Sequence, residues 1–159
     1  MSDDVGGTDN VAMADAQLEV LRLEACLELL RAHTVGRVAV IVSESPLVFP
    51  VNYTVVETER PLWIALRTRP GNIIDRASKQ AAFEIDRIDL SEHEGWSVLV
   101  RGTFHRVDPD SAEFRERFDP QPWLENQRDA WLILEPFSIT GRFLRSPQPQ
   151  WPLHLGDYV

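Results

Sequence analysis

The sequence predicts a single, mainly β domain with short helices, built around six antiparallel strands. Its length of 159 residues is normal for one domain and allows a sizeable core to be buried. Six apolar or alternating segments, separated by turn-forming residues, have the length and pattern of strands. Gly102 and Pro136 lie inside two of the longer segments, where they indicate the bulges or bends that a closed barrel needs. A small antiparallel barrel is therefore expected, with a sandwich as the alternative that pattern alone leaves open.

The expected elements alternate along the chain. Leu23, Cys26, Leu27 and Leu30 recur with helical spacing and predict a first helix over 20–33. Pro50 lies inside the second strand, which predicts an edge position or a bulge there. Two further short helices are expected over 71–79 and 109–118, each opened by a proline. The expected strands are 37–42, 47–56, 62–68, 81–88, 95–107 and 130–145.

Both ends of the chain differ in composition from the domain between them. Residues 1–17 contain four acids and no base, which predicts a disordered tail. Residues 146–159 contain three prolines, so an extended tail lying across a surface is expected. The folded domain is accordingly expected to span 18–145.

Charge and cysteine content exclude several classes of protein. The formal net charge is −9, so nothing draws the chain generally toward nucleic acid or an anionic membrane. Lys79 is the only lysine among 16 basic residues, so an anion site must rely on arginine and backbone N–H groups. Cys26 is the only cysteine, which excludes an internal disulfide and a cysteine-cluster metal site. With no secretory signal and no apolar run of spanning length, a cytoplasmic protein without a membrane segment is expected.

Five sequence blocks in a fixed order resemble the pyridoxamine 5′-phosphate oxidase-like family, in its short actinobacterial branch, over about 22–145. The blocks are Cys26–Leu30 with His33–Val40, Phe49–Tyr53, Leu66–Gly71, Ala82–Asp86 and Gly95–Gly102. The resemblance implies a six-stranded antiparallel split β-barrel, FMN as cofactor, and a homodimer with two flavins between the subunits.

A flavin phosphate needs cationic or N–H donors, and the segment 66–72 offers them. Arg67 and Arg69 supply guanidinium groups, Thr68 a hydroxyl, and Asn72 an amide at the start of a short helix. The resemblance favours this interpretation, whereas the residues alone are also consistent with a solvated strand end.

The flavin ring needs an apolar slot with donors at its polar edge. Pro50, Val51 and Asn52 are expected to line the ring, because the resemblance places their strand beside it. The resemblance also places Trp96 and Ser97 near the flavin of the neighbouring subunit. The alternatives are a capped bulge at Asn52 and plain core packing for Trp96.

The resulting prediction is an FMN-dependent oxidoreductase acting on a small molecule that the sequence does not name. The flavin supplies the chemistry in such enzymes, so no catalytic residue of the protein is predicted. Two alternatives remain open: a non-enzymatic flavin- or haem-binding carrier, and a reductase that uses a deazaflavin coenzyme. The four histidines show no metal-ligand spacing, and no metal site is expected.

Overall fold

The computed structural model describes residues 17–58, 62–77, 79–107, 112–121 and 129–146, so most of the two predicted tails lies outside the described residues. The strands are β1 (Gln17–Leu21), β2 (Val35–Val42), β3 (Ser45–Val56), β4 (Trp63–Thr68), β5 (Gln80–Asp89), β6 (Glu94–Val107) and β7 (Ala130–Arg145). The helices are α1 (Leu23–Ala32), α2 (Ile73–Arg76) and α3 (Ala112–Phe118).

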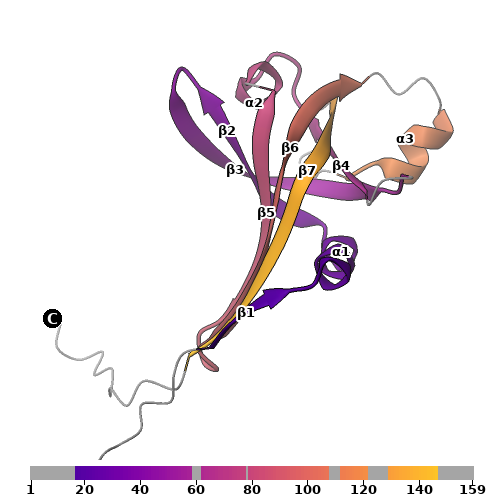
Figure 1. Ribbon diagram of the computed structural model, residues 1–159. Helices are drawn as coiled ribbons and strands as arrows, with labels where there is room; N and C mark the ends of the chain where they lie inside the picture. Colours follow the sequence, from indigo (N-terminus) through magenta and orange to yellow (C-terminus); the bar gives the residue numbers. More distant parts are fainter. Residues whose placement is uncertain (1–16, 59–61, 78, 108–111, 122–128, 147–159) are drawn as a thin grey trace, which may run out of the picture.

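Six of the strands close into an antiparallel ring. Their order is β7-β4-β3-β2-β5-β6, and β6 pairs back onto β7. β7 is the longest strand, and its first part pairs with β4 while nearly its whole length pairs with β6. Figure 1 shows the ring above, with β5, β6 and β7 continuing downward as a long arm that β1 joins. The predicted mainly β split barrel is therefore confirmed.

Alternation along the strands produces the core inside the ring. In β6, Val98 and Val100 are buried, whereas Leu99 between them and Arg101 after them face outward. The same period of two in neighbouring strands gathers branched and aromatic side chains on the inner face. Helix α1 packs against this core through Cys26. Further fully buried core residues are Leu30, Val38, Tyr53, Leu62, Leu66, Phe83 and Ile85.

The predicted irregularities in the strands are present. Arg101 pairs with Ser138 but Gly102 pairs with Pro136, so Phe137 is the extra residue of a bulge. A Cβ at Gly102 would lie 2.4 Å from the carbonyl oxygen of Glu135, which explains why glycine is needed there. Pro50 is at an edge: β3 pairs with β2 around it, but β4 pairs only with Tyr53–Val56.

The start of the domain differs from the prediction. A helix was expected from residue 20, but α1 begins at Leu23, and Val20 and Leu21 belong to strand β1. β1 pairs with the end of β7, more than a hundred residues away, and Val20 is 81% exposed. The local sequence pattern contains no information about such a distant partner, so Val20 and Leu21 are expected in the helix that follows them.

A second, smaller core lies on the outside of the ring. Val56, Ala65 and Ile133 are buried there, and Phe118 at the end of α3 packs against them. α3 therefore stands over the outer surface of β3 and β4 and brings the residues that follow it close to these strands. Within the described ranges, no helix is long and apolar enough to cross a membrane.

Candidate functional site

Four predicted site residues lie on the outer face of the ring, the face that points away from the core. Pro50 and Asn52 are two residues apart on β3, and Arg67 lies on β4 one step beyond the Tyr53–Leu66 pair. Ser97 also faces outward, because it alternates with buried Val98. The structure therefore brings Pro50, Asn52 and Arg67 together on adjacent strands, with Ser97 three strands further along the same face.

Three other predicted site residues point the opposite way. Val51 is 8% exposed and Thr68 is 1% exposed, so both belong to the interior. Trp96 packs against the main core, and its ring meets that of His33 edge-on at 5.0 Å. Consecutive residues of a strand face opposite sides, so Val51 and Thr68 are separated from their outward-facing neighbours by the sheet itself. Trp96 packs inward, yet it also borders the same hollow of about 400 Å³ as Ser97.

Three hollows follow one another across the outer face. The first, of about 180 Å³, is lined by Thr34 and Asn52 among others. The second, of about 240 Å³, lies beside Val35 and Pro50. The third, of about 400 Å³, shares Asp86 with the second and extends down the arm. Asn52 of the first hollow lies opposite Val35 of the second, and the second and third hollows share Asp86, so the hollows form one row.

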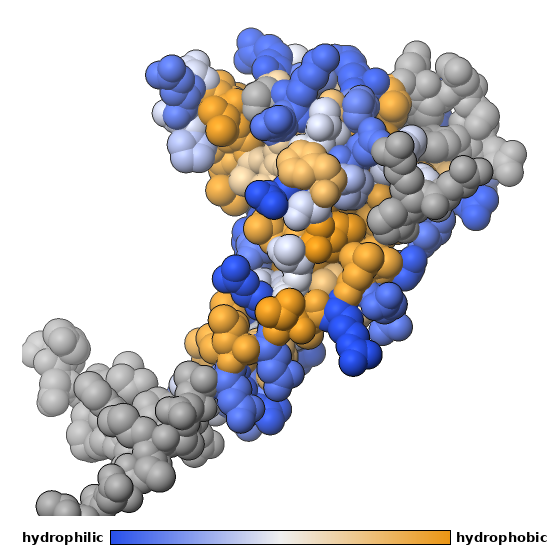
Figure 2. Space-filling view, in the orientation of Figure 1, coloured by the Kyte–Doolittle hydropathy of each residue, from blue (hydrophilic) through white to orange (hydrophobic). Residues whose placement is uncertain are grey.

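The third hollow is the most apolar. Leu18, Ile88, Leu90 and Leu144 line it with 47–82% of their surface exposed. Figure 2 shows apolar side chains extending from the barrel down the arm in the same orientation as Figure 1. At its rim, hydrogen bonds from the Ser91 hydroxyl and from the backbone N–H groups of Glu92 and Ser91 lower the pKa of Asp89.

Between the second and third hollows, an ion pair joins the adjacent strands β2 and β5. Arg37 of β2 donates a hydrogen bond to Asp86 of β5, and Asp86 lies opposite Ser97 of β6. Arg37 also lies opposite Pro50 of β3. This pair therefore connects the Pro50 and Ser97 parts of the outer face. The alternation of buried and exposed residues in β2 and β5 is sufficient to place Arg37 and Asp86 on the outer face, yet neither residue is among the predicted site residues.

Arg67 is held by acidic residues rather than exposed to solvent. Its Nη1 donates to both carboxylate oxygens of Asp119, at 3.0 and 2.8 Å, and its Nη2 lies 3.9 Å from Asp129. The guanidinium carbon also lies 5.4 Å from the ring centre of Trp131, within the range of a cation–π contact. Arg69 is exposed, and no ion pair joins it to another described residue.

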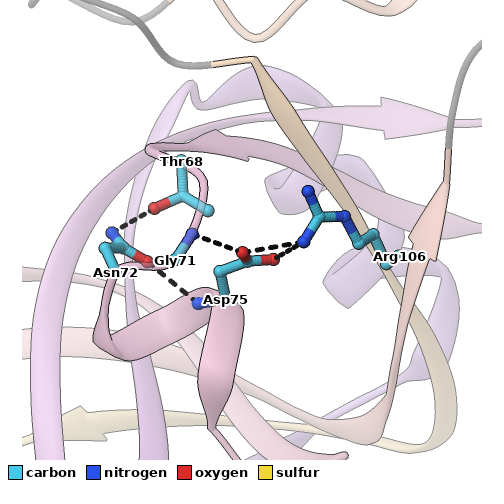
Figure 3. Close-up of polar contacts among 5 residues, drawn as sticks. All are labelled: Thr68, Gly71, Asn72, Asp75 and Arg106. Atoms are coloured by element: carbon cyan, nitrogen blue, oxygen red, sulfur yellow. Dashed lines mark hydrogen bonds and ion pairs between the residues drawn. The ribbon is translucent and has the colours of Figure 1, made fainter.

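Asn72 and Thr68 form a structural link at the start of α2 (Figure 3). Asn72 Nδ2 donates to Thr68 Oγ1, and Asn72 Oδ1 accepts a 2.9 Å hydrogen bond from the backbone N–H of Asp75. The Asp75 carboxylate in turn accepts from the Gly71 N–H at 2.6 Å and from Arg106 at 2.8 Å. Both polar ends of Asn72 are thus engaged in shaping the turn.

The outer face can accommodate an elongated ligand with an anionic end. Arg67 provides a guanidinium group for that end, and Asn52 provides an amide next to the first hollow. No group of three potential metal ligands occurs among the described residues. Asp119 could not be found from local sequence patterns, because it is 52 positions away from Arg67, its hydrogen-bond partner.

Comparison with known proteins agrees with this architecture. Residues 22–143 match the family model described as pyridoxamine 5′-phosphate oxidase. The chain is 31% identical to the uncharacterized Mycobacterium tuberculosis protein Rv0080 over 130 residues, which is 77% of this chain and 84% of that protein.

Two solved structures are also similar. One, from Corynebacterium glutamicum and named after pyridoxamine 5′-phosphate oxidase, has 26% identity and a TM-score of 0.65, covering 89% of this chain and all of that one. The other is described as the FAD binding protein from Mycobacterium smegmatis, with 27% identity and a TM-score of 0.60, covering 81% of this chain and all of that one. The match to the family model extends over most of the chain, and the chain therefore belongs to the pyridoxamine 5′-phosphate oxidase family.

Proposed function

We propose that this protein is a flavin-dependent oxidoreductase that binds FMN on the outer face of its barrel and acts on a small molecule. The observation that carries the proposal is the row of hollows that begins beside Asn52 and Asp119, the carboxylate that pairs with Arg67. The description of the M. smegmatis relative as an FAD binding protein supports a flavin in general. A bound flavin would supply the redox chemistry, as cofactors do in such enzymes.

The chain's own residues would bind and orient this cofactor. Arg67 would contact the phosphate, because a guanidinium group forms strong, directed hydrogen bonds with phosphate oxygens. Asn52 would donate to the polar part of the flavin next to the first hollow, and Pro50 would present an apolar edge to it. Thr68 and Asn72 would act indirectly, by fixing the turn after β4.

A homodimer is part of the proposal. The arm carries exposed apolar side chains that a monomer would leave in water, and exposed patches of this kind mark interaction surfaces. They are Leu18, Val20, Ile88, Leu90 and Leu144. Two-fold pairing of identical chains is the commonest way to cover such a surface. A second copy on the arm would also complete the third hollow beside Ser97.

The test is a titration of FMN with the wild-type protein, Arg67→Ala and a matched control, Arg31→Ala. Arg31 also pairs with a carboxylate, that of Glu57 at 2.8 Å, but it lies on α1. Loss of a charge-assisted contact worth about 1.5–3 kcal/mol predicts roughly ten- to hundredfold weaker binding by Arg67→Ala. The control should bind like the wild type. Unchanged binding by Arg67→Ala would move the phosphate site elsewhere.

The absorption spectrum of the purified protein separates the alternatives. Two flavin bands support the proposal, and a Soret band would indicate haem. Failure to bind FMN combined with binding of a deazaflavin would indicate the reductase alternative. Reduction of the bound flavin by a nicotinamide nucleotide, followed by reoxidation with a candidate substrate, tests whether the protein is an enzyme or a carrier.

A further inference from the structure

The third hollow, of about 400 Å³, is walled by apolar residues that the strand register places in one line across the arm. Leu18 of β1 lies opposite Leu144 of β7. Gly95 of β6 lies between Leu144 and Ile88 of β5, and it has no side chain to fill the space there. The three apolar side chains are 47–69% exposed. The hollow therefore has the apolar walls and the volume of a site for a small organic molecule.

Two of the four carboxylates that line this hollow are neutralised by arginines. Asp86 pairs with Arg37, which lines the second hollow. Glu94 pairs with Arg145 at the end of β7, at 3.0 Å. Each pair combines one negative and one positive charge, so together the two pairs add little net charge to the hollow.

The other charges that line the hollow are not balanced. No ion pair joins Glu84, Asp89 or Arg142 to another described residue. The Asp89 carboxylate accepts hydrogen bonds from uncharged donors, which are the Ser91 hydroxyl and two backbone N–H groups. Two negative charges and one positive charge therefore remain around the hollow. This excess disfavours an anionic ligand, whereas it has no such effect on an uncharged one.

We propose that the third hollow binds an apolar molecule without a negative charge, and that a molecule of this class is the substrate of the proposed oxidoreductase. This inference rests on the proposed flavin site. The second and third hollows share Asp86, so a molecule in the third lies next to an occupant of the second. The first two hollows, beside Asn52 and Pro50, remain for the flavin.

Two fluorescent probes with the same ring skeleton test the preference for charge. N-phenyl-1-naphthylamine is uncharged, whereas 8-anilino-1-naphthalenesulfonate carries one negative charge, and both fluoresce more strongly in apolar surroundings. Titration of the wild-type protein should show one site per chain for the uncharged probe and weaker binding of the sulfonate. Saturating FMN should leave the affinity for the uncharged probe unchanged, because the flavin is placed in the first two hollows.

Two variants should move the affinity for the sulfonate in opposite directions. Glu84→Gln removes a negative charge and should tighten binding of the sulfonate about twofold at low salt. Arg142→Gln removes the positive charge and should weaken it about twofold. Neither variant should alter binding of the uncharged probe. Glu57→Gln changes the net charge as Glu84→Gln does, but it removes the partner of Arg31, and this control should alter neither affinity.

The apolar wall is tested with the uncharged probe. Leu144→Asn should weaken its binding roughly fivefold, because part of the apolar contact is lost. Ile41→Asn is the matched control, since Ile41 is similarly exposed on β2 but lies outside the hollow. It should leave the affinity unchanged. Thermal unfolding and light scattering check that each variant keeps the fold and the mass of the wild type.

The outcomes separate this inference from the flavin proposal. If FMN binds but the uncharged probe does not, or if Glu84→Gln and Arg142→Gln affect both probes alike, the substrate site is overturned and the flavin site stands. Competition between FMN and the uncharged probe would also overturn it, because the flavin would then occupy the third hollow. If the probes behave as expected but FMN does not bind, the hollow remains a site for apolar molecules and the flavin proposal alone fails.

Discussion

The hydroxyl of Tyr53 donates a 2.7 Å hydrogen bond to the carbonyl oxygen of Leu30, which joins strand β3 to the last turn of α1. Both residues are at most 1% exposed. The Tyr53 ring also meets Phe83 edge-on at 4.7 Å. A single buried side chain thus fixes the helix against the ring on the inner side of the strand that carries Pro50 and Asn52 on its outer side.

Removing that hydroxyl should destabilise the protein. Tyr53→Phe leaves the Leu30 carbonyl buried without its partner, so we expect the free energy of unfolding to fall by about 1–2 kcal/mol. Urea denaturation followed by circular dichroism measures the change. Phe83→Leu, which loses the ring contact but keeps the hydrogen bond, should show a separate loss that adds incompletely to the first, because the two residues touch.

The same tyrosine predicts an alkaline dependence of stability. Burial raises the pKa of Tyr53 well above its ordinary value. Above about pH 10 the unfolded chain therefore loses this proton while the folded chain keeps it, so stability falls as the pH rises through that range. Each pH unit should cost about 1.4 kcal/mol once the unfolded tyrosine is ionised. Tyr53→Phe should flatten this dependence, and an equal slope in both proteins would contradict the prediction.

The bulge at Gly102 should tolerate no side chain. A Cβ there would meet the backbone of Glu135 at 2.4 Å, and backbone at the β6–β7 seam cannot move without disturbing the ring closure. We expect Gly102→Ala to lower the free energy of unfolding by about 3 kcal/mol. Gly71→Ala is the matched control, because Gly71 has a φ of 73° but open space around it. It should cost only about 1 kcal/mol.

The cap of α2 should contribute to stability even though the helix is short. Asn72→Ala removes the acceptor for the Asp75 N–H and the donor for Thr68, and should cost about 1 kcal/mol or somewhat more. Asn72→Asp keeps the acceptor and should retain most of the stability. Thermal unfolding of the two variants side by side tests the order. A more stable alanine variant would show that the cap has no net effect.

The oligomeric state tests the proposed use of the arm. Light scattering should give about twice the 18.2 kDa mass of one chain. Ile88 is 69% exposed on the arm, so Ile88→Glu should shift the mass toward the monomer by placing charge in the interface. Leu23→Glu, at an exposed position on α1, is the control and should leave the mass unchanged. A monomeric wild type would overturn the dimer.

Much of the fold could be predicted because strand patterns are local. The strands of the ring can be predicted from the alternation of apolar and polar residues and from the turn residues between them. The bulge at Gly102 and the edge position of Pro50 can be predicted because glycine and proline disturb the regular backbone pairing of a β-sheet. Strand β1 could not be predicted, since only its distant partner in β7 explains it. Which strands close the ring is likewise a matter of non-local pairing.

The candidate site is harder to predict from the sequence than the fold is, because neighbouring residues of a strand lie on opposite faces of the sheet. Contiguous motifs suggested contiguous sites, yet Arg67 and Thr68, like Trp96 and Ser97, face opposite sides of the sheet. The alternation of side chains along a strand is enough to predict that the two residues of each pair face opposite sides of the sheet. The Arg67–Asp119 pair could not have been found that way, because it depends on where α3 places the chain 52 positions later.

The position of β7 in the ring has a consequence for how the protein is made. This strand joins β4 to β6, yet among the described strands it is the one that leaves the ribosome last. Until residues 130–145 emerge, β4 and β6 both present unpaired backbone edges, which are templates for intermolecular pairing. A nascent chain stopped before Ala130 should therefore depend on chaperones, and release of β7 should convert it in one cooperative step to a form that resists proteolysis.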